Sequence, residues 1–415
     1  SYEKAGGTLV ILQADPVRGI ATLAETLGAE AVYWNSDVEP YSTERDRAVV
    51  EALKEKGIES HQHWDQVLHA PGTILTGSDK PYRVYSPFWR NWQKQTKASP
   101  YAAPETLEKL TSQEHTLAKQ AGAIALLKTQ DLDVTWDNPL NIPVGEAAAL
   151  EALDQFCDNR PITEYDEARN FPIQAGTSQL SAALKFGTVG IRTVWSRANQ
   201  VYDRCRSDEE RKGVQVWQQE LAWREFYQHV MYIFPELSEG PYREQFKAFP
   251  WSDNQDHFQA WCEGRTGYPI VDAAMRQLNE TGWMHNRCRM IVASFLTKDL
   301  ILNWQWGEKY FMQRLVDGDL SANNGGWQWS ASSGMDPKPL RIFNPASQAQ
   351  KFDAAGDYIR RWLPELSSVS TKKLVTGSIS TAECDRADYP APIVDHSVQQ
   401  RTFKALYKEA KEAVG

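Results

Sequence analysis

The side chains best able to carry chemistry are concentrated in one short stretch, residues 317–329, which reads DGDLSANNGGWQW. Asp317 and Asp319 can accept hydrogen bonds from a heterocycle or a sugar, and Asn323 and Asn324 can both donate and accept them. Such a composition suits a hydrophobic core poorly, because buried carboxylates and amides need polar partners. We therefore interpret the stretch as the lining of a site for a polar, planar cofactor.

Glycines and tryptophans in the same stretch support this interpretation. Gly325 and Gly326 would let the main chain approach a ligand closely, and Trp327 and Trp329 would supply flat apolar walls. A surface turn is the alternative, since Asn-Gly-Gly by itself is a turn signal. Two tryptophans directly after the glycines argue against it, because a surface turn would leave them in water.

Residues 176–187, GTSQLSAALKFG, predict a short helix bracketed by glycines. Thr177 and Ser178 stand where such a helix is capped, and Ser181 falls in its first turn. Free N–H groups, hydroxyls and the helix dipole would then converge on one spot that suits a phosphate. Capping alone is the alternative interpretation of this motif.

A longer helix is predicted over 214–234, where a proline follows. Trp217, Glu220, Arg224 and Tyr227 recur there at intervals of three and four residues, so that an aromatic, an acid and a base share one face. A surface ion pair between the acid and the base is the alternative. The aromatic neighbours of both residues indicate instead that this face is partly buried.

A third helix, predicted over 282–304, places Asn286, Arg289, Met290 and Ala293 on one face by the same spacing. Met290 alone would be read as core filling, because methionine commonly packs irregular gaps. The helix therefore supports the functional interpretation only together with the other motifs.

The elements that must position these motifs begin with an α/β pattern. Short apolar runs at 8–15, 31–34 and 60–64 alternate with helical stretches. Strands separated by helices predict a parallel sheet that is covered on both faces. The chain opens with SYEKAGG, which reads like the tail of a helix, so we expect a preceding strand and most of its helix to be absent from this sequence.

The length of 415 residues exceeds what a single core usually supports, so we expect two domains. From about residue 70 to 143 prolines recur and no helical or strand period is sustained, and only helical patterns follow. The aromatic segment 85–92, YSPFWRNW, should pack on one of the domains. The predicted fold class is α/β plus all-α, with an α/β domain at 1–75, an interdomain connection at 76–145 and a helical domain at 146–415.

Composition limits the class of protein. Five cysteines lie far apart with no Cys-x-x-Cys spacing, which argues against a disulfide framework and a zinc site and favours a reducing, cytoplasmic setting. No apolar run reaches the length of a membrane span. The net charge of -9 argues against indiscriminate binding of polyanions, but an excess of basic residues within 285–361 allows a local basic face.

Four motifs together resemble the photolyase/cryptochrome flavoprotein family: TSQLS at 177–181, WQQELAWREFY at 217–227, GWMHNRCRM at 282–290 and DGDLSANNGGWQWSAS at 317–332. Within the family, the chain is most similar to cyanobacterial cyclobutane pyrimidine dimer photolyases. The resemblance covers nearly the whole chain. It implies an incomplete Rossmann-like parallel sheet followed by a large helical domain that binds FAD.

The activity that the resemblance implies is light-driven DNA repair by a carbon–carbon lyase. Excited, fully reduced FADH⁻ passes an electron to a cyclobutane pyrimidine dimer, the cyclobutane ring opens, and the electron returns. The dimer must first be flipped out of the duplex, and photolyases are themselves among the standard examples of base flipping. The protein sets the geometry and electronics of the flavin, which carries the electron.

The resemblance also assigns roles to individual residues. Those expected at the FAD are Tyr165, Thr177, Ser178, Leu180, Ser181, Trp217, Arg224, Asn286, Arg289, Asp317, Asp319 and Asn323. Those expected at the dimer are Glu220, Trp223, Asn286, Met290 and Trp329. Asn323 is expected to face flavin N5, beside the dimer. Electrons are expected to reach the flavin through Trp327, Trp304 and Trp251. Phosphates beside the lesion are expected to be held by Arg169, Arg287, Arg341 and Lys351.

Within these sets, Arg289 is expected to pair with Asp317, and Trp223 and Trp329 are expected to wall the dimer. Glu220 is expected to be protonated in the complex, because a carboxyl beside a dimer radical anion stabilises the developing charge only if it donates a hydrogen bond. Its aromatic neighbours in the sequence motivate this hypothesis.

The sequence departs from the family pattern at its start. The family's first strand, of the type F-x-R-D-L-R, has no counterpart before Ser1. Similar cyanobacterial enzymes use an 8-hydroxy-deazaflavin antenna, and residues 32–46 match the domain that holds it. Because the first strand helps to form the antenna site, we expect this chain to be impaired in antenna binding.

Other functions fit less well. A (6-4) photolyase would carry histidines where this chain has Asn286 and Met290. A cryptochrome-like blue-light sensor, which often replaces Asn323 and adds a C-terminal tail, ranks second. A carbohydrate hydrolase would need carboxylates on both sides of a glycosidic bond, whereas Asp317 and Asp319 are only two residues apart. We expect a monomer that binds dimer-containing DNA and does not enter a membrane.

Overall fold

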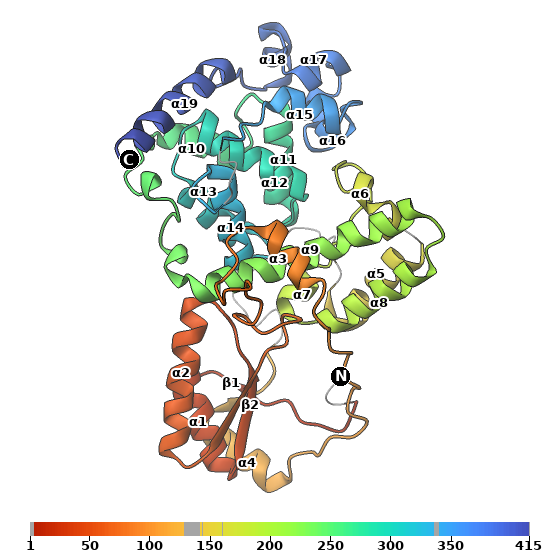
Figure 1. Cartoon of the computed structure of the whole chain (residues 1–415), viewed down its shortest axis with the longest axis vertical. Helices are drawn as coiled ribbons and strands as arrows, with labels where there is room; N and C mark the ends of the chain where they lie inside the picture. The colour runs from red at the N-terminus through yellow and green to blue at the C-terminus, as the bar shows by residue number, and fades with distance from the viewer. Residues whose placement is uncertain (1–3, 128–141, 143, 160, 336–339, 415) are drawn as a thin grey trace. The chain divides into compact units, whose positions relative to one another are not determined.

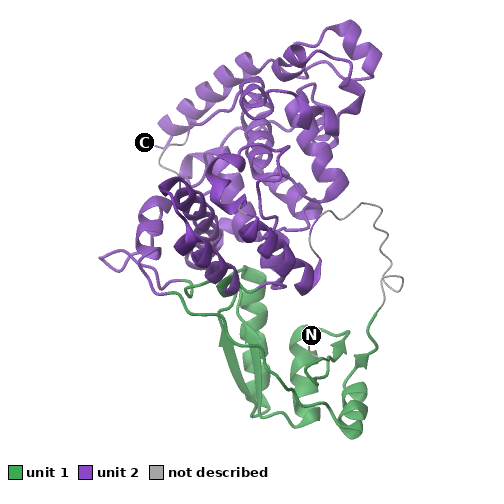
Figure 2. Ribbon diagram, turned by 90° about the vertical axis from the view of Figure 1, so that its right-hand side faces the viewer, with its two compact units in different colours: residues 1–71, 97–137, 190–192 green, residues 72–96, 138–189, 193–415 purple. Residues whose placement is uncertain are grey.

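The computed structural model describes residues 4–127, 142, 144–159, 161–335 and 340–414. The chain forms two compact units (Figure 2). The α/β unit consists of 1–71, 97–137 and 190–192, and the helical unit consists of 72–96, 138–189 and 193–415. The segment predicted as an interdomain connection is thus shared between the two units.

The α/β unit is small. Its strands and helices are β1 (Ile11–Leu12), β2 (Ala31–Asn35), β3 (Glu59–His63), β4 (Ala123–Ile124), α1 (Pro16–Leu27), α2 (Pro40–Glu55) and α4 (Ser112–Gln120). β2 and β3 pair in parallel, with Ala31 opposite Glu59. α1 and α2 pack together, and Ala21, Ala24 and Leu53 lie at the centre of the small core that they share.

The sheet of this unit differs from the predicted one, because β1 pairs antiparallel with β4 and not with β2. The hydrogen bonds of the segment before β1 give the reason. The N–H of Leu107 donates to the carbonyl of Ala5 at 2.6 Å, and the N–H of Leu110 donates to Thr8 Oγ1 at 3.1 Å. The chain entering β1 therefore follows residues 107–124. The α/β class is confirmed, but the expectation of one continuous parallel sheet was wrong.

The helical unit is confirmed as helical, since its described residues after 144 contain no strand. Its α-helices are α3 (Tyr85–Trp92), α5 (Gly145–Asp158), α6 (Tyr165–Ala168), α7 (Ser181–Phe186), α8 (Ile191–Arg204, from its third residue), α9 (Asp208–Ile233), α10 (Gln255–Glu263), α11 (Pro269–Thr281), α12 (Asn286–Ser294), α13 (Trp304–Arg314), α14 (Leu320–Ala331), α15 (Pro345–Phe352), α16 (Asp357–Trp362), α17 (Thr371–Thr376), α18 (Thr381–Ala387) and α19 (His396–Glu412). Across the described ranges, no helix combines the length and apolarity that crossing a bilayer requires.

α11 is almost completely buried in the helical unit, where α10, α12 and α16 pack around it (Figure 1). Pro269 occupies its first turn, where the fixed φ of proline suits a helix and no N–H is missed. The helix ends where Gly282 adopts a φ of 67°, a left-handed conformation that a side chain would disfavour. α12, which carries Asn286, Arg287, Arg289 and Met290, packs directly on α11 and in turn contacts α14.

α9 begins at Asp208, six residues before the predicted start. Ser207 caps it by accepting a hydrogen bond from the N–H of Glu210 at 3.2 Å, and the first turns that follow are too polar to show an apolar period. α3 packs on α9, where Trp92 Nε1 donates to Glu225 Oε1 at 2.7 Å. The expectation that the aromatic segment 85–92 packs on a domain is therefore confirmed.

The helix predicted over 282–304 is interrupted. α12 ends at Ser294, a π-helical turn η5 (Phe295–Asp299) follows, and α13 starts only at Trp304. Ile301 adopts a φ of 55° between them, which is incompatible with a continuing right-handed helix. The apolar spacing alone could not reveal the break, because η5 is buried on all sides.

Candidate active site

The two carboxylates at the start of the 317–329 stretch have different partners. Asp317 is paired with Arg289 of α12, whose Nη2 lies 2.9 Å from Oδ2 and 3.2 Å from Oδ1. Arg289 is held in turn by the carbonyl of Met284, which accepts from Nε at 2.8 Å. Only 3% of the Asp317 side chain is exposed, so this ion pair is largely removed from water. The pair that the sequence predicted is present.

Asp319 serves α14 directly. Its side chain caps the helix by accepting from the N–H of Ala322 at 2.9 Å, and its Oδ2 lies 3.3 Å from Lys185 Nζ of α7. The cap orients the carboxylate toward the positive end of the helix dipole. The start of α14 and the end of α7 are thereby joined at one charged point.

The two asparagines of α14 both contact Glu308 of α13. Asn323 Nδ2 donates to the main-chain carbonyl of Glu308 at 3.0 Å, and Asn324 Nδ2 donates to Glu308 Oε1 at 2.8 Å. Asn324 also donates to the carbonyl of Leu237 at 2.8 Å. Asn324 is therefore used to join helices, whereas Asn323 is only half-buried. Sequence reasoning missed Glu308, which reads as an ordinary exposed helix residue.

Burial raises the pKa of Glu308 to about 7, and the hydrogen bond from Asn324 only partly opposes this effect. Between pH 4.5 and 7 the unfolded chain loses this proton while the folded chain keeps it, so stability falls as pH rises. We predict that Glu308→Gln, whose amide oxygen still accepts from Asn324, raises the free energy of unfolding above pH 7 by up to about 3 kcal/mol. Urea titrations across pH should show a flatter profile for this variant. Exposed Glu280→Gln is the control, and an unchanged profile for Glu308→Gln would contradict the prediction.

The glycines of the stretch do two different things. A Cβ at Gly325 would lie 2.1 Å from the ring of Tyr227, so this glycine permits the close packing of α14 on α9. A Cβ at Gly326 would meet nothing within 4 Å, so space is open beside it. The expectation of two glycines facing a ligand therefore has support only at Gly326.

The three tryptophans of the predicted electron path share one hydrophobic core. Trp304 and Trp327 belong to it, and half-buried Trp251 packs against it. A Cβ at Gly307 would lie 2.1 Å from the Trp327 ring, so the glycine makes room for that ring. Trp327 Nε1 is buried and makes no hydrogen bond within the described ranges.

The 177–181 motif precedes a shorter helix than predicted. α7 begins at Ser181 with Leu180 at the N-cap, so the expectation that Thr177 or Ser178 caps it was wrong. Gly176 fixes the approach, because a Cβ there would lie 2.7 Å from that of Ala168. Thr177 and Ser178 precede the helix without capping it, and Ser181 is its first residue.

α9 connects this motif to the rest of the site. Arg224 Nη2 donates to the carbonyl of Leu184 in α7 at 3.3 Å. Trp217 is buried, with its ring 5.3 Å from that of Phe156. Tyr165 at the start of α6 is also buried, which raises its pKa, and the charge of Glu220 raises it further.

Glu220 is paired with Arg169 in the structure. Enclosure raises the pKa of Glu220, and the positive charge of Arg169 opposes the rise, although a third of the Glu220 side chain, 33%, is exposed. The charge of Glu220 raises the pKa of both Tyr85 and Tyr165, after the larger effect of burial. Glu220 thus lies near two phenols. Arg169 is the one cation among the groups that shift its pKa.

The aromatic walls line an apolar cavity of about 340 Å³ between α3, α9 and α14. Trp223 and Trp329 both border it, and Arg341 lies at its edge with Cζ 5.1 Å from the Trp329 ring centre. Tyr85 stacks on Trp223 with ring centres 3.5 Å apart, a contact that the sequence could not assign. Glu220, Asn286 and Met290 are not among the described residues that line this cavity.

The remaining predicted residues lie on α12 and around a second cavity. Asn286 is exposed, and its Nδ2 lies 4.0 Å from Met290 Sδ. A cavity of about 520 Å³ is bordered by Arg287 and Lys351. Arg287 Cζ and Lys351 Nζ lie 4.3 and 5.2 Å from the same ring, that of Phe352. Burial lowers the pKa of Arg287, and the nearby charge of Arg169 lowers it further.

Two protein-family models match this chain. The family model described as the FAD binding domain of DNA photolyase matches residues 217–409, and the model described as DNA photolyase matches residues 1–107. A deoxyribodipyrimidine photo-lyase of Synechococcus is 57% identical over 413 residues, covering 100% of this chain and 85% of the relative. Among solved structures, a class III photolyase from Agrobacterium tumefaciens covers 99% of this chain and 86% of its own, with 37% identity and a TM-score of 0.85. A Synechocystis cryptochrome covers 98% and 85%, with 27% identity and a TM-score of 0.88.

Proposed function

The chain belongs to the photolyase/cryptochrome family, and from this premise we propose that it is a deoxyribodipyrimidine photo-lyase that uses FAD and light to repair DNA. Its substrate is DNA that contains cyclobutane pyrimidine dimers. The observation that supports this best is the double role of α14, which carries Asp319 and Asn323 at one end and Trp329, in the wall of the apolar cavity, at the other. One rigid helix thus holds groups for the cofactor and for the dimer at a fixed separation.

The residues around the start of α14 fit a polar cofactor. Asp317 and Asp319 are buried carboxylates, and the Oγ of Ser321 is buried without a hydrogen bond inside the described part of the chain. Such groups are costly unless a ligand pairs with them. Open space beside Gly326 leaves room for one. FAD, bound in its reduced form, supplies the electron that opens the dimer.

We assign the residues predicted from the sequence to this cofactor. Arg289 orients Asp317, and Asn323 is fixed by the carbonyl of Glu308, so both polar groups are held before the cofactor arrives. The other residues assigned to the cofactor are Tyr165, Thr177, Ser178, Leu180, Ser181, Trp217, Arg224, Asn286 and Asp319.

Glu220 is assigned to the dimer. In the structure its carboxylate is paired with Arg169, so it cannot donate a hydrogen bond in that state. A DNA phosphate that draws Arg169 away would leave Glu220 without its paired cation. Without the cation, burial favours the protonated carboxyl, which can then donate to a dimer carbonyl as negative charge develops there.

Replacement of Glu220 by glutamine tests this assignment. We expect the wild-type repair rate to fall as pH rises above the ordinary range of a glutamate, because the raised pKa of Glu220 sets the loss of its proton there. The Gln variant should be slower by roughly tenfold at low pH, less than the ~10²–10³ for a lost donor because its amide still donates, and flat with pH. Exposed Glu236→Gln is the control. Full repair and dimer affinity in Glu220→Gln would refute the assignment.

DNA is assigned to the basic groups around the second cavity and beside Trp329. Arg169 lies close enough for its charge to disfavour that of Arg287, an arrangement that a phosphate would relieve. Lys351 borders the same cavity as Arg287, and its Nζ lies 5.2 Å from the ring centre of Phe352. Arg341 adds a fourth positive charge at the edge of the apolar cavity. The acidic chain can thus present a local basic face to the lesion strand.

The decisive experiment measures loss of a thymine dimer from an oligonucleotide incubated with the reduced, FAD-loaded chain in blue light and in darkness. Repair in light only is the expected result. The similarity to a cryptochrome structure makes a blue-light sensor the second candidate. Bound FAD without repair and without dimer-selective DNA binding would favour the sensor. Impaired binding of an 8-hydroxy-deazaflavin antenna, a cytoplasmic location and a monomeric state stay predictions from the sequence.

A further inference from the structure

Two consecutive charged residues, Lys298 and Asp299, are buried in the π-helical turn η5. Their exposed fractions are 1% and 0%. Burying two charges is expensive unless each is held by partners, and π-helical turns are rare and occur frequently at functional sites. The partners of the two side chains therefore indicate what this turn does.

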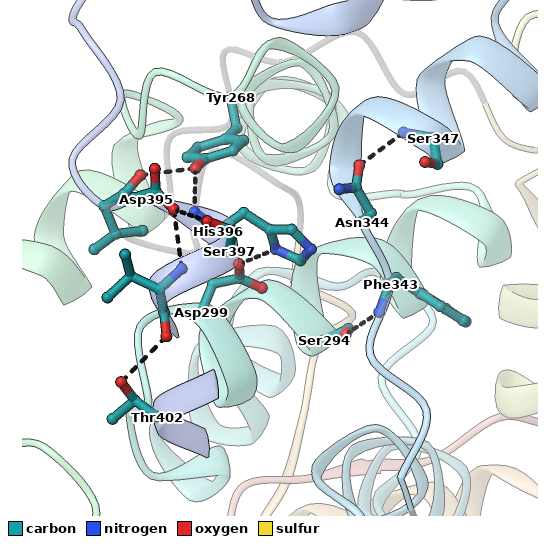
Figure 3. Close-up of polar contacts among 12 residues, drawn as sticks. Tyr268, Ser294, Asp299, Phe343, Asn344, Ser347, Asp395, His396, Ser397 and Thr402 are labelled. Atoms are coloured by element: carbon teal, nitrogen blue, oxygen red, sulfur yellow. Dashed lines mark hydrogen bonds and ion pairs between the residues drawn. The ribbon is translucent and has the colours of Figure 1, made fainter. Parts of the chain in front are cut away.

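Asp299 holds the C-terminal helix. It is hydrogen-bonded to His396 at the start of α19, and the main-chain N–H of His396 donates to the hydroxyl of Tyr268 at 3.1 Å (Figure 3). Burial raises the pKa of Asp299, and its hydrogen bond raises that of His396. These contacts account for Asp299 as a structural residue that attaches α19.

Lys298 contacts α19 and also a second segment: its Nζ lies 5.9 Å from the ring centre of Phe403 in α19. Its Nζ donates to the main-chain carbonyl of Arg341. Four residues earlier, Ser294 Oγ accepts a hydrogen bond from the N–H of Phe343 at 3.2 Å (Figure 3). Two side chains one helical turn apart thus fix the main chain at both ends of residues 341–343.

The segment 341–343 lies against the wall of the apolar cavity. The guanidinium of Arg341 lies 5.1 Å from the ring centre of Trp329, and the ring of Phe343 lies 6.3 Å from it at an angle of 56°. Arg341 is exposed. The hydrogen bonds that Lys298 and Ser294 make with the main chain of 341–343 hold the backbone from which its guanidinium extends.

We propose that Lys298 is a positioning residue for substrate, which holds the main chain at Arg341 so that the guanidinium stays over Trp329 at the mouth of the cavity. The inference rests on the proposed function, because it needs dimer-containing DNA as the ligand. Lys298 cannot touch that DNA directly, since its ammonium is buried. Its contribution to binding therefore passes through Arg341.

A double-mutant cycle in the FAD-loaded chain tests the proposal. Lys298→Met keeps most of the length of the side chain but removes the donor to the Arg341 carbonyl. We expect it to weaken binding of a thymine-dimer oligonucleotide in the dark by about tenfold, as Arg341→Ala should. Both variants should reduce the slope of log K against log salt concentration by about 0.9, the value of one phosphate contact. The double variant should bind no more weakly than Arg341→Ala alone, because both changes remove one interaction.

Additive losses in the cycle, or unchanged dimer affinity in Lys298→Met, would overturn the proposal. Asp299→Asn is the matched control from the same turn, and it should lower thermal stability without changing dimer affinity. If Lys298→Met does not fold, Ser294→Ala takes its place in the cycle. Its loss of dimer affinity should be smaller than that expected for Lys298→Met, but again not additive with that of Arg341→Ala. Wild-type chain that fails to prefer dimer-containing over undamaged DNA would refute the proposed function itself, which separates the two failures.

Discussion

Replacement of Arg289 by methionine is expected to release the flavin and to lower the free energy of unfolding by about 3 kcal/mol. The reason is the buried partner: Asp317 is only 3% exposed, so removal of the guanidinium strands its charge away from water. Breaking a buried ion pair from one side typically costs ~3–5 kcal/mol. Loss of the orientation of Asp317 should weaken FAD binding by about tenfold or more, as for a lost hydrogen bond to a charged group. The measurements are urea denaturation and the ratio of flavin to protein absorbance.

A matched ion pair elsewhere in the helical unit provides the control. Arg276 of α11 is 25% exposed, the same fraction as Arg289, but its partner Glu365 is 24% exposed. Water can therefore replace the guanidinium at Glu365, and Arg276→Met should cost no more than about 1 kcal/mol and leave flavin content unchanged. Equal losses in the two variants would show that the burial of Asp317 is not what makes its pair important.

Local sequence patterns predicted the parts of the site that lie close together along the chain. The 317–329 stretch brings Asp319, Asn323 and Trp329 onto one helix, and their residue types alone indicated a polar site with an aromatic wall. The structure adds that Asp319 is also the cap of that helix. A carboxylate at position 319 can both cap α14 and accept a hydrogen bond from a ligand. The sequence pattern alone does not tell these two roles apart.

Contacts between distant segments could not be predicted in the same way. Glu308 of α13 meets Asn324 of α14, which is 16 residues further along the chain. Tyr85 meets Trp223, which is more than a hundred residues further along. Spacing along the sequence identifies which residues share a face, but not which face of another element will cover it. Buried charges are the hardest case, because Lys298 and Glu308 have the residue types of an exposed surface. Their burial becomes visible only when the packing of η5 and α13 is known.

Trp329→Ala is expected to weaken binding of dimer-containing DNA by roughly 10- to 100-fold while leaving flavin content unchanged. An aromatic platform for a nucleobase contributes ~1–3 kcal/mol per base. Trp329 lines the apolar cavity and also carries the guanidinium of Arg341 at 5.1 Å, so its loss removes the stacking surface and the support for a cation. Fluorescence anisotropy with dimer-containing and undamaged oligonucleotides, in darkness, measures the effect.

Two further variants separate stacking from general damage to the core. Trp329→Phe keeps an aromatic face at the cavity and should recover most of the dimer affinity. Trp306→Ala removes a half-buried tryptophan that packs on Phe258, with ring centres 5.3 Å apart, and lines neither described cavity. That change should lower stability without affecting the preference for dimers. If Trp306→Ala and Trp329→Ala reduced dimer affinity equally, the wall of the cavity would not be the binding platform, and the dimer would have to be placed elsewhere on the helical unit.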